Sequence, residues 1–117
     1  MRKMLCMLML CAMFGYGPVA RANGYNANWT GIVTSISAYT YNDQIVFSLS
    51  SMPSEPAGTC SSAGFMITAA DSDAESRARI YATLISAYLT GQPVSVGYDN
   101  TGASCSDGFI TAFRVGF

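Results

Sequence analysis

Apolar and polar residues alternate in several short segments of the chain, which is the pattern of β-strands with one buried face. Trp29–Tyr41 is rich in β-branched and aromatic residues, and Ile45, Phe47 and Leu49 alternate in the segment that follows. Between them, Tyr41–Gln44 contains Asn and Asp, which tolerate the left-handed backbone of a tight turn. We therefore expect these two segments to form a β-hairpin.

A helical period replaces this alternation in the middle of the chain. Five apolar residues are spaced one and three positions apart, which places them on one face of an α-helix: Ile80, Tyr81, Leu84, Ile85 and Tyr88. The sequence predicts a helix from about Ala74 to Thr90 that buries this face. Tyr81 and Tyr88 are therefore expected in the core.

Both ends of this helix carry stop signals. Asp71–Asp73 offers candidate N-caps, and Ser72 and Glu75 have the spacing of a capping box. Gly91 has the conformational freedom of a left-handed C-cap, and Pro93 prevents the helix from continuing. The three clustered acids, Asp71, Asp73 and Glu75, are interpreted as helix-stabilising charges rather than as ligands of a hard cation.

Three further segments have strand patterns: Gly64–Ala69, Pro93–Tyr98 and Phe109–Phe117. The resulting order is strand–strand–strand–helix–strand–strand. This is the order of an OB-fold, a small five-stranded barrel whose helix lies between its third and fourth strands. We expect a mainly β (α+β) domain of this OB-fold-like type. The alternative is an open antiparallel sheet with the helix packed on one face.

Residues 1–22 have the pattern of an export signal. Arg2 and Lys3 precede Met4–Phe14, an apolar run of 11 residues that is too short to span about 30 Å of hydrocarbon. Ala20–Ala22 has the small-x-small pattern of a cleavage site. We expect a cleaved signal peptide, a single domain over 23–117, and a secreted or periplasmic protein of a Gram-negative bacterium without membrane insertion.

Charge and composition exclude several function classes. The expected mature chain keeps three arginines, at 77, 79 and 114, and seven acidic residues, so its net charge is −4. A negative surface disfavours nucleic acids and anionic membranes. The chain has no histidine, which excludes Ser-His-Asp triads and imidazole metal sites. Arg77 and Arg79 are expected to be solvated, with Glu75–Arg79 as an i,i+4 pair.

Cys60 and Cys105 remain after removal of the leader and form an even pair in an oxidising compartment. We predict a disulfide between them, since neither a CxxC spacing nor a histidine indicates a reactive thiol pair. The bond would contribute about 4 kcal/mol in the chain-entropy model.

Asp99 and Asp107 are the candidates for paired catalytic carboxylates. Both lie in turn-rich sequence, and turn chemistry accounts for them. We find no set of residues that supplies a nucleophile, a base and an orienting partner, so we predict neither an enzyme nor a cofactor or metal.

Two motifs give the chain a family resemblance: Trp29-Thr30-Gly31 opening the first strand, and Tyr88–Val94 from helix end to fourth strand, followed by Tyr98. In these motifs and in element order the chain resembles the B subunits of subtilase cytotoxin and of pertussis-like toxins. The resemblance implies a secreted OB-fold that binds cell-surface glycans, a homopentamer, and a toxin A subunit as partner.

The resemblance also implies a sugar site made of a polar residue, a strand-one hydroxyl and a strand-four tyrosine. Asn26, Thr30 and Tyr98 occupy those places, with Asn26 where the family has an aspartate. The family also uses an acid near strands two and three, and Glu55 is the acid of this chain in that region. Trp29, by contrast, is expected to plug the core.

The sequence therefore predicts a secreted, non-catalytic binding module that holds a cell-surface glycan through Tyr98, Thr30 and Asn26. An aromatic ring beside hydroxyls and amides suits a polyhydroxyl ligand, because the ring covers C–H groups while the polar atoms bond the hydroxyls. The alternative is a periplasmic or secreted structural module that binds another protein through its exposed β surface or loops.

Overall fold

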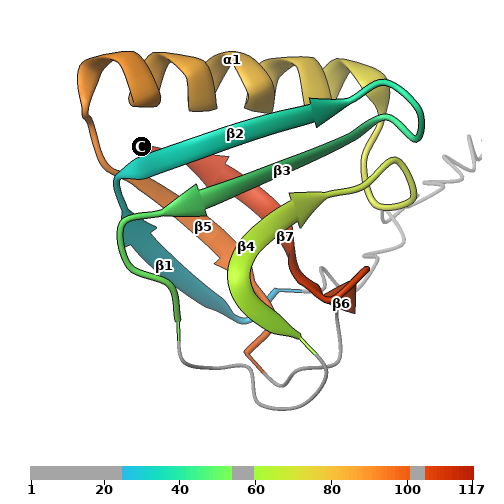
Figure 1. The fold of residues 1–117 in the computed structure, drawn as a ribbon, viewed down its shortest axis with the longest axis horizontal. Helices are drawn as coiled ribbons and strands as arrows, with labels where there is room; N and C mark the ends of the chain where they lie inside the picture. The colour runs from blue at the N-terminus through green and yellow to red at the C-terminus, as the bar shows by residue number, and fades with distance from the viewer. Residues whose placement is uncertain (1–24, 54–59, 101–104) are drawn as a thin grey trace, which may run out of the picture.

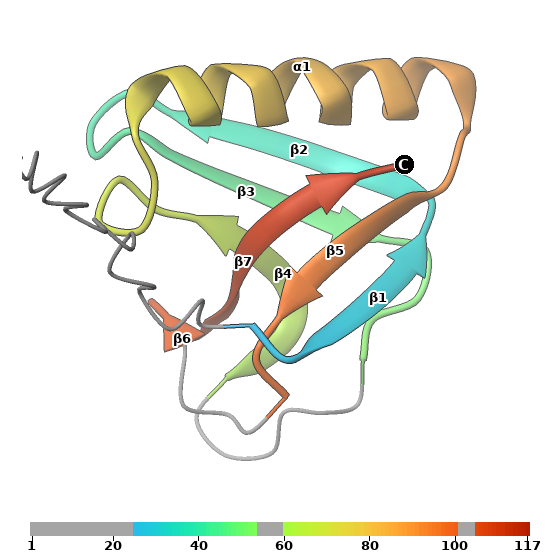
Figure 2. The ribbon, with the colours of Figure 1, turned by 180° about the vertical axis from the view of Figure 1, so that it is seen from behind.

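The computed structural model describes residues 25–53, 60–100 and 105–117 as one mixed β-sheet and one helix (Figures 1 and 2). The fold is thus mainly β with one α-helix, as expected. The elements in chain order are β1 (Ala27–Gly31), β2 (Val33–Tyr39), β3 (Gln44–Leu49), β4 (Ser61–Ile67), α1 (Ala74–Thr90), β5 (Val94–Tyr98), β6 (Cys105–Ser106) and β7 (Phe109–Gly116).

The strands lie in the order β1-β5-β7-β4-β3-β2, and the short β6 pairs with β7. The β4–β7 pair is parallel and the other pairs are antiparallel, so the alternative of a purely antiparallel sheet is wrong. β1 and β2 stand at opposite ends of this order although only Ile32 separates them in the chain. The sheet therefore curls until its two ends meet at one residue.

The long first strand expected from the sequence is divided at this point. Gly31 comes so close to β3 that an added Cβ would lie 3.1 Å from the Cβ of Leu49. Beyond the break, the backbone N–H of Ser50 donates to the carbonyl of Ile32 at 2.7 Å. A side chain at Gly31 would obstruct this approach, which explains glycine at the bend.

The helix has the bounds that the sequence predicts. Asp73 is its N-cap, because its carboxylate accepts from the backbone N–H of Ser76 at 2.7 Å. Gly91 ends it in the left-handed conformation, with φ of 70°. The expected capping box is not formed, since the Ser72 hydroxyl donates to the carbonyl of Thr68 instead.

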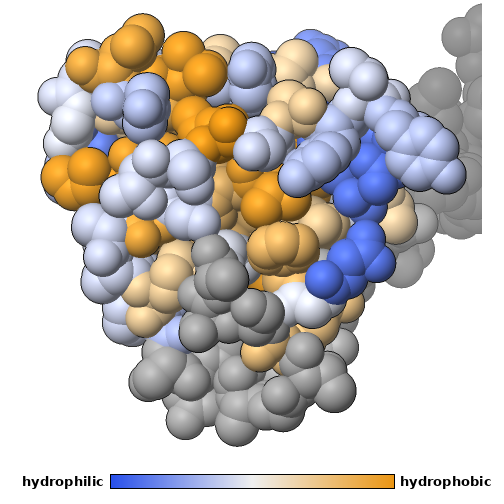
Figure 3. Space-filling view, viewed as in Figure 1, coloured by the Kyte–Doolittle hydropathy of each residue, from blue (hydrophilic) through white to orange (hydrophobic). Residues whose placement is uncertain are grey.

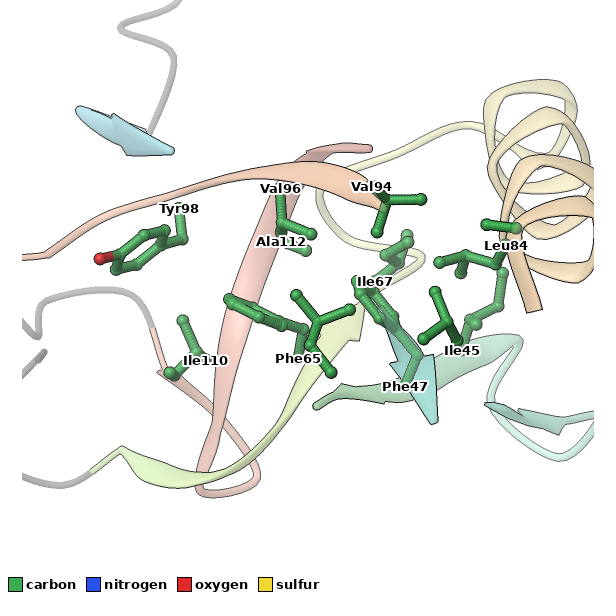
Figure 4. Packing of buried hydrophobic residues seen from close by; sticks show 13 residues of the cluster. Ile45, Phe47, Phe65, Ile67, Leu84, Val94, Val96, Tyr98, Ile110 and Ala112 are labelled. Atoms are coloured by element: carbon green, nitrogen blue, oxygen red, sulfur yellow. The ribbon is translucent and has the colours of Figure 1, made fainter. Parts of the chain in front are cut away.

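The core lies between the curled sheet and α1 (Figure 4). Phe47 and Phe65 stack with ring centroids 5.5 Å apart, and Phe65 meets the ring of Tyr98 edge to face at 5.9 Å. Leu84 is fully buried on the helix side. Trp29 packs at the margin of this cluster and donates its indole N–H to the carbonyl of Ser51 at 2.8 Å.

Three expectations about side-chain burial on α1 are wrong. Tyr81 and Tyr88 keep 39% and 52% of their surface exposed. Arg77, expected in solvent, is only 8% exposed and pairs with Asp43 at the β2–β3 turn. The helix is therefore rotated so that Arg77, Leu84 and Ala87 face inward and the tyrosines lie on its flank. The Glu75–Arg79 pair is confirmed.

The disulfide between Cys60 and Cys105 is confirmed, with a Cα–Cα distance of 5.3 Å and a sequence separation of 45. It joins the start of β4 to β6. The expected signal peptide, residues 1–22, lies outside the described residues. Among those that are described, no helix has the length and hydrophobicity that a membrane crossing requires.

Candidate functional site

The strands β1, β5 and β7 lie in front in Figure 2. Their outer face presents an ordered set of polar groups. Register places these outward positions in two rows across the three strands. The rows are Asn28–Gly97–Arg114 and Thr30–Ser95–Gly116. Directly opposed side chains on one sheet face lie about 5 Å apart. The face therefore combines an amide, two hydroxyls and a guanidinium, with a glycine in each row. We call it the polar face.

A tyrosine fills the place that Gly97 leaves empty. An added Cβ at Gly97 would lie 3.0 Å from Cδ2 of Tyr25 and 3.1 Å from Cβ of Arg114. The phenol ring of Tyr25 and the stem of Arg114 therefore share the space above this glycine. A glycine in a strand permits such close approach of an aromatic ring.

The guanidinium of Arg114 extends over the second row. Its Nη1 donates to Oγ of Ser95 at 3.4 Å, and an added Cβ at Gly116 would lie 3.2 Å from its Nη2. The side chain is exposed, and the two ion pairs found in the described part of the chain involve the other two arginines. Arg114 thus offers N–H donors to a ligand on the polar face.

Two of the three residues expected to bind a sugar are exposed at this face. Thr30 lies in its second row, opposite Ser95. Asn26 precedes β1, and its backbone N–H donates to the carbonyl of Tyr98 at 3.0 Å. Its side chain is used within the protein, because Oδ1 accepts from the Asn100 backbone at 3.0 Å and Nδ2 donates to Asp99 at 3.3 Å. Asn26 therefore holds the turn after β5.

The third expected residue, Tyr98, lies on the opposite side of the sheet. Its side chain is 5% exposed and points into the core beside Phe65 and Ile110 (Figure 4). The strand separates its ring from Thr30, since Tyr98 is opposite the partly buried Ala27. The structure therefore does not bring the three residues together, and stacking on this ring would require the core to open.

The acids at the start of α1 accept hydrogen bonds within the protein, and Asp73 is the helix cap. Asp71 accepts from the Thr68 hydroxyl at 2.7 Å, and Asp73 accepts from Ser76. The hydrogen bonds from Ser76, chiefly that from its backbone, lower the pKa of Asp73 below its usual value. Asp71 and Asp73 line a hollow of about 460 Å³ with Phe113. Because both carboxylates already accept hydrogen bonds within the protein, this hollow needs no ligand to explain it.

Within residues 25–53, 60–100 and 105–117, no three acidic or sulfur-bearing side chains gather as metal ligands would. Asp107 occupies the β6–β7 turn with φ of 50°, which fits the turn interpretation. Glu55 lies outside the described residues.

Sequence reasoning missed Tyr25 and Arg114 as site residues. Tyr25 lies in a polar arm without periodicity, and its partner is 72 positions away in the chain. The one signal for this contact in the sequence was Gly97, because a glycine at an outward strand position leaves space for another side chain. Searches for a matching family model, for a similar curated protein and for a similar solved structure each find no match.

Proposed function

We propose that this protein is an exported, non-catalytic binding module that holds a glycan on the polar face. The observation that carries the proposal is the placement of the Tyr25 ring and the Arg114 side chain over Gly97, beside the hydroxyls of the exposed Thr30 and the half-buried Ser95. A flat ring covers the C–H face of a sugar, while hydroxyls, amides and N–H donors bond its oxygens.

Within this proposal the ligand-binding residues are Tyr25, Thr30, Ser95 and Arg114. Thr30 is retained from the resemblance. Asn26 supports the site by fixing the turn at Asp99 and Asn100. Tyr98 supports it from beneath, as a core residue of β5. The absence of histidine from the sequence is the basis for proposing binding rather than catalysis.

The finer fold proposal is an OB-type barrel with five strands. In it, β1 and β2 are the two halves of the first strand, followed by β3, β4, β5 and β7. Three observations support this: the two ends of the sheet meet at Ile32, β4 and β7 run parallel, and α1 lies between the third and fourth barrel strands.

Location and assembly are proposed from the sequence and the family resemblance. A leader over 1–22 implies a secreted or periplasmic protein, and the toxin-like motifs imply a homopentamer that carries an A subunit. Light scattering on the exported protein tests the ring. A mass near five protomers supports it, because five weak sugar sites then act together. A monomeric mass rejects it and leaves the polar face as a single site.

The binding proposal is tested on an array of immobilised glycans, followed by solution titration of the strongest sugar. Tyr25→Ala should weaken binding about tenfold, the loss expected for about 1.4 kcal/mol of ring contact. Tyr41→Ala is the matched control, because this tyrosine is 96% exposed on the β2–β3 turn, away from the polar face. Equal affinities for the two variants, or an array without any binder, would reject the proposal.

A further inference from the structure

The strand β2 has one edge without a partner strand. It stands at the end of the sheet order, and among the described residues it pairs with β3 alone. Its sequence, VTSISAY, contains neither a charge nor a proline. Proteins usually block such edges with charged residues, proline or bulges, because unpaired N–H and C=O groups accept another strand. The one bulge in β2 lies at its start, between Val33 and Ser35, and leaves the rest of the edge regular.

The helix α1 runs along this strand (Figure 1). It lines two hollows beside β2 with an apolar flank. The flank consists of Ala78, Tyr81, Ile85 and Tyr88, whose spacing of three, four and three aligns them on one stripe. Two hollows lie between flank and strand, of about 230 Å³ and 310 Å³. Figure 3 shows hydrophobic side chains gathered over the second half of α1 and the start of β2.

We call the two hollows together the helix-flank groove. The direction of the β2 side chains shows how this groove lies relative to the free edge. Ile36 and Ala38 are opposite the buried residues Phe47 and Ile45, so they point to the inner face on which α1 packs. They line the two hollows together with the helix flank. A strand added at the free edge would therefore lie beneath this flank. Every second side chain of the added strand would contact the flank, and the others would face solvent.

The charges around the groove neutralise one another. The hollow of about 230 Å³ is lined by Arg77 and Asp43, which form an ion pair with each other. Nε of Arg77 is buried and has no hydrogen-bond partner in the described residues. The pair ties the β2–β3 turn to α1, so the groove is formed before a ligand arrives. An uncharged groove disfavours a charged occupant, which would lose its water without gaining a counter-charge.

We propose that this groove binds an extended, uncharged peptide segment of a partner protein by strand addition to β2. Backbone hydrogen bonds would supply affinity, and the helix flank would select apolar side chains at alternate positions. The seven residues of β2 span about 23 Å, enough for a peptide of similar length. A two-fold pair of copies joined through their β2 strands fits less well, because two helices about 10 Å wide would meet over strands about 4.8 Å apart.

The test uses NMR on the ¹⁵N-labelled, exported protein at 0.15 M salt. The probe is a capped seven-residue peptide of alternating threonine and isoleucine, with two lysines at one end for solubility. Bound peptide should slow hydrogen exchange at least tenfold for the β2 amides that point to the free edge. It should also shift the NMR signals of the helix-flank residues. The control peptide carries N-methyl groups on alternate amides, which remove the hydrogen bonds and keep side chains and charge.

Two matched variants separate groove binding from general adhesion. Ala78→Arg places a long charged side chain on the flank and should lower the affinity for the peptide at least tenfold. Ala82→Arg makes the same change one turn later, at an exposed position outside both hollows, and should leave binding unchanged. The proposal is overturned if the N-methylated peptide binds equally well or if both variants bind alike. It is also overturned if β2 is already protected without peptide in a dimer or a larger ring, since a neighbouring copy then covers the edge.

Discussion

The polar face and the helix-flank groove are built from the same sheet by opposite means. On the polar face, register fixes each side chain beside a neighbour, and glycines at 97 and 116 make room for the Tyr25 ring and the Arg114 guanidinium. In the groove, an exposed strand edge leaves backbone groups unpaired beside an apolar helix stripe. The first surface recognises a ligand through side chains, and the second through main chain.

The difference shows how one small domain can offer separate surfaces to two unrelated ligands. Side-chain recognition suits hydroxyl groups, because each donor and acceptor has a fixed place. Main-chain recognition suits an extended peptide, whatever its detailed sequence. The two surfaces share one core and one disulfide. A change to the shared core should therefore affect both surfaces, and a change to either surface should affect that one alone.

The largest effect is expected from removing the disulfide. The double change Cys60→Ser and Cys105→Ser frees a loop of 45 residues and should lower the free energy of unfolding by about 4 kcal/mol. Urea denaturation measures the loss, and both binding activities should fall together as the folded fraction falls. Intact mass of the unreduced wild-type protein is the independent check, because two free thiols there would contradict the bond.

The next effect compares two tyrosines on opposite sides of the same sheet. Tyr98→Ala removes a buried ring that contacts Phe65 and should cost about 3 kcal/mol of unfolding free energy. Tyr25→Ala removes a half-exposed ring and should lower the unfolding free energy by less than about 1 kcal/mol, while it weakens sugar binding. Urea midpoints and sugar titrations on both variants decide this. A stable Tyr98→Ala protein that has lost sugar binding would restore Tyr98 as the site.

These tyrosines show what the sequence could predict. The alternation of Val94, Val96 and Tyr98 places all three on one face, and the structure buries all three. The family resemblance had assigned Tyr98 to a ligand instead. The alternation was local information about this chain, whereas the sugar site was transferred from other proteins. Tyr25 was not predictable in the same way, because its position depends on a glycine in a distant strand.

The helix shows a similar limit. Its bounds, its C-cap and the Glu75–Arg79 pair follow from residues within a few positions of one another, and all are confirmed. Its rotation about its own axis depends on the rest of the fold. Arg77 is buried because Asp43, 34 positions earlier, lies where its guanidinium arrives. A periodic stripe identifies the inner side of a helix only to within about one neighbouring row of residues.

A smaller effect is expected from breaking the Asp43–Arg77 ion pair, which ties the β2–β3 turn to α1 at one end of the groove. Asp43→Asn keeps a residue that tolerates the observed φ of 53° but removes the charge opposite Arg77. Because Arg77 stays buried with a weaker partner, the protein should lose about 1–2 kcal/mol of unfolding free energy. Peptide binding should weaken, and sugar binding should not change.

Asp107→Asn is the matched control for this change. Asp107 also has a positive φ, of 50°, but it lies in the β6–β7 turn, and its charge has no ion-pair partner within the described ranges. Its substitution should leave urea midpoints and both affinities nearly unchanged. Equal losses in the two variants would show that the turn backbone matters rather than the charge, and the role given to the Asp43–Arg77 pair would be abandoned.

The smallest effect concerns acid and the first turn of α1. The folded-state pKa of Asp73 is lowered, chiefly by the hydrogen bond from the Ser76 backbone. The cap therefore contributes fully above about pH 4, the ordinary range of an aspartate, and is lost as the pH falls through the lower folded value. Acid should thus lower the protection of the Ser76 amide and its neighbours in the first turn, measured as the exchange rate relative to that of an unstructured peptide at the same pH. The polar face contains no residue of this turn, and its amides should keep their protection.

Asp73→Asn separates this cap from the other acids that titrate in the same range. An asparagine still caps the helix but carries no charge to lose, so the protection of the Ser76 amide relative to its intrinsic exchange rate should become nearly independent of pH between about 5 and 2. Asp71→Asn should retain the wild-type dependence, because Asp71 contacts Thr68 rather than the helix N–H groups. If acid affects Ser95 and Arg114 as strongly as Ser76, the protein unfolds as one unit. The groove and the polar face then share their stability, and they differ only in what they bind.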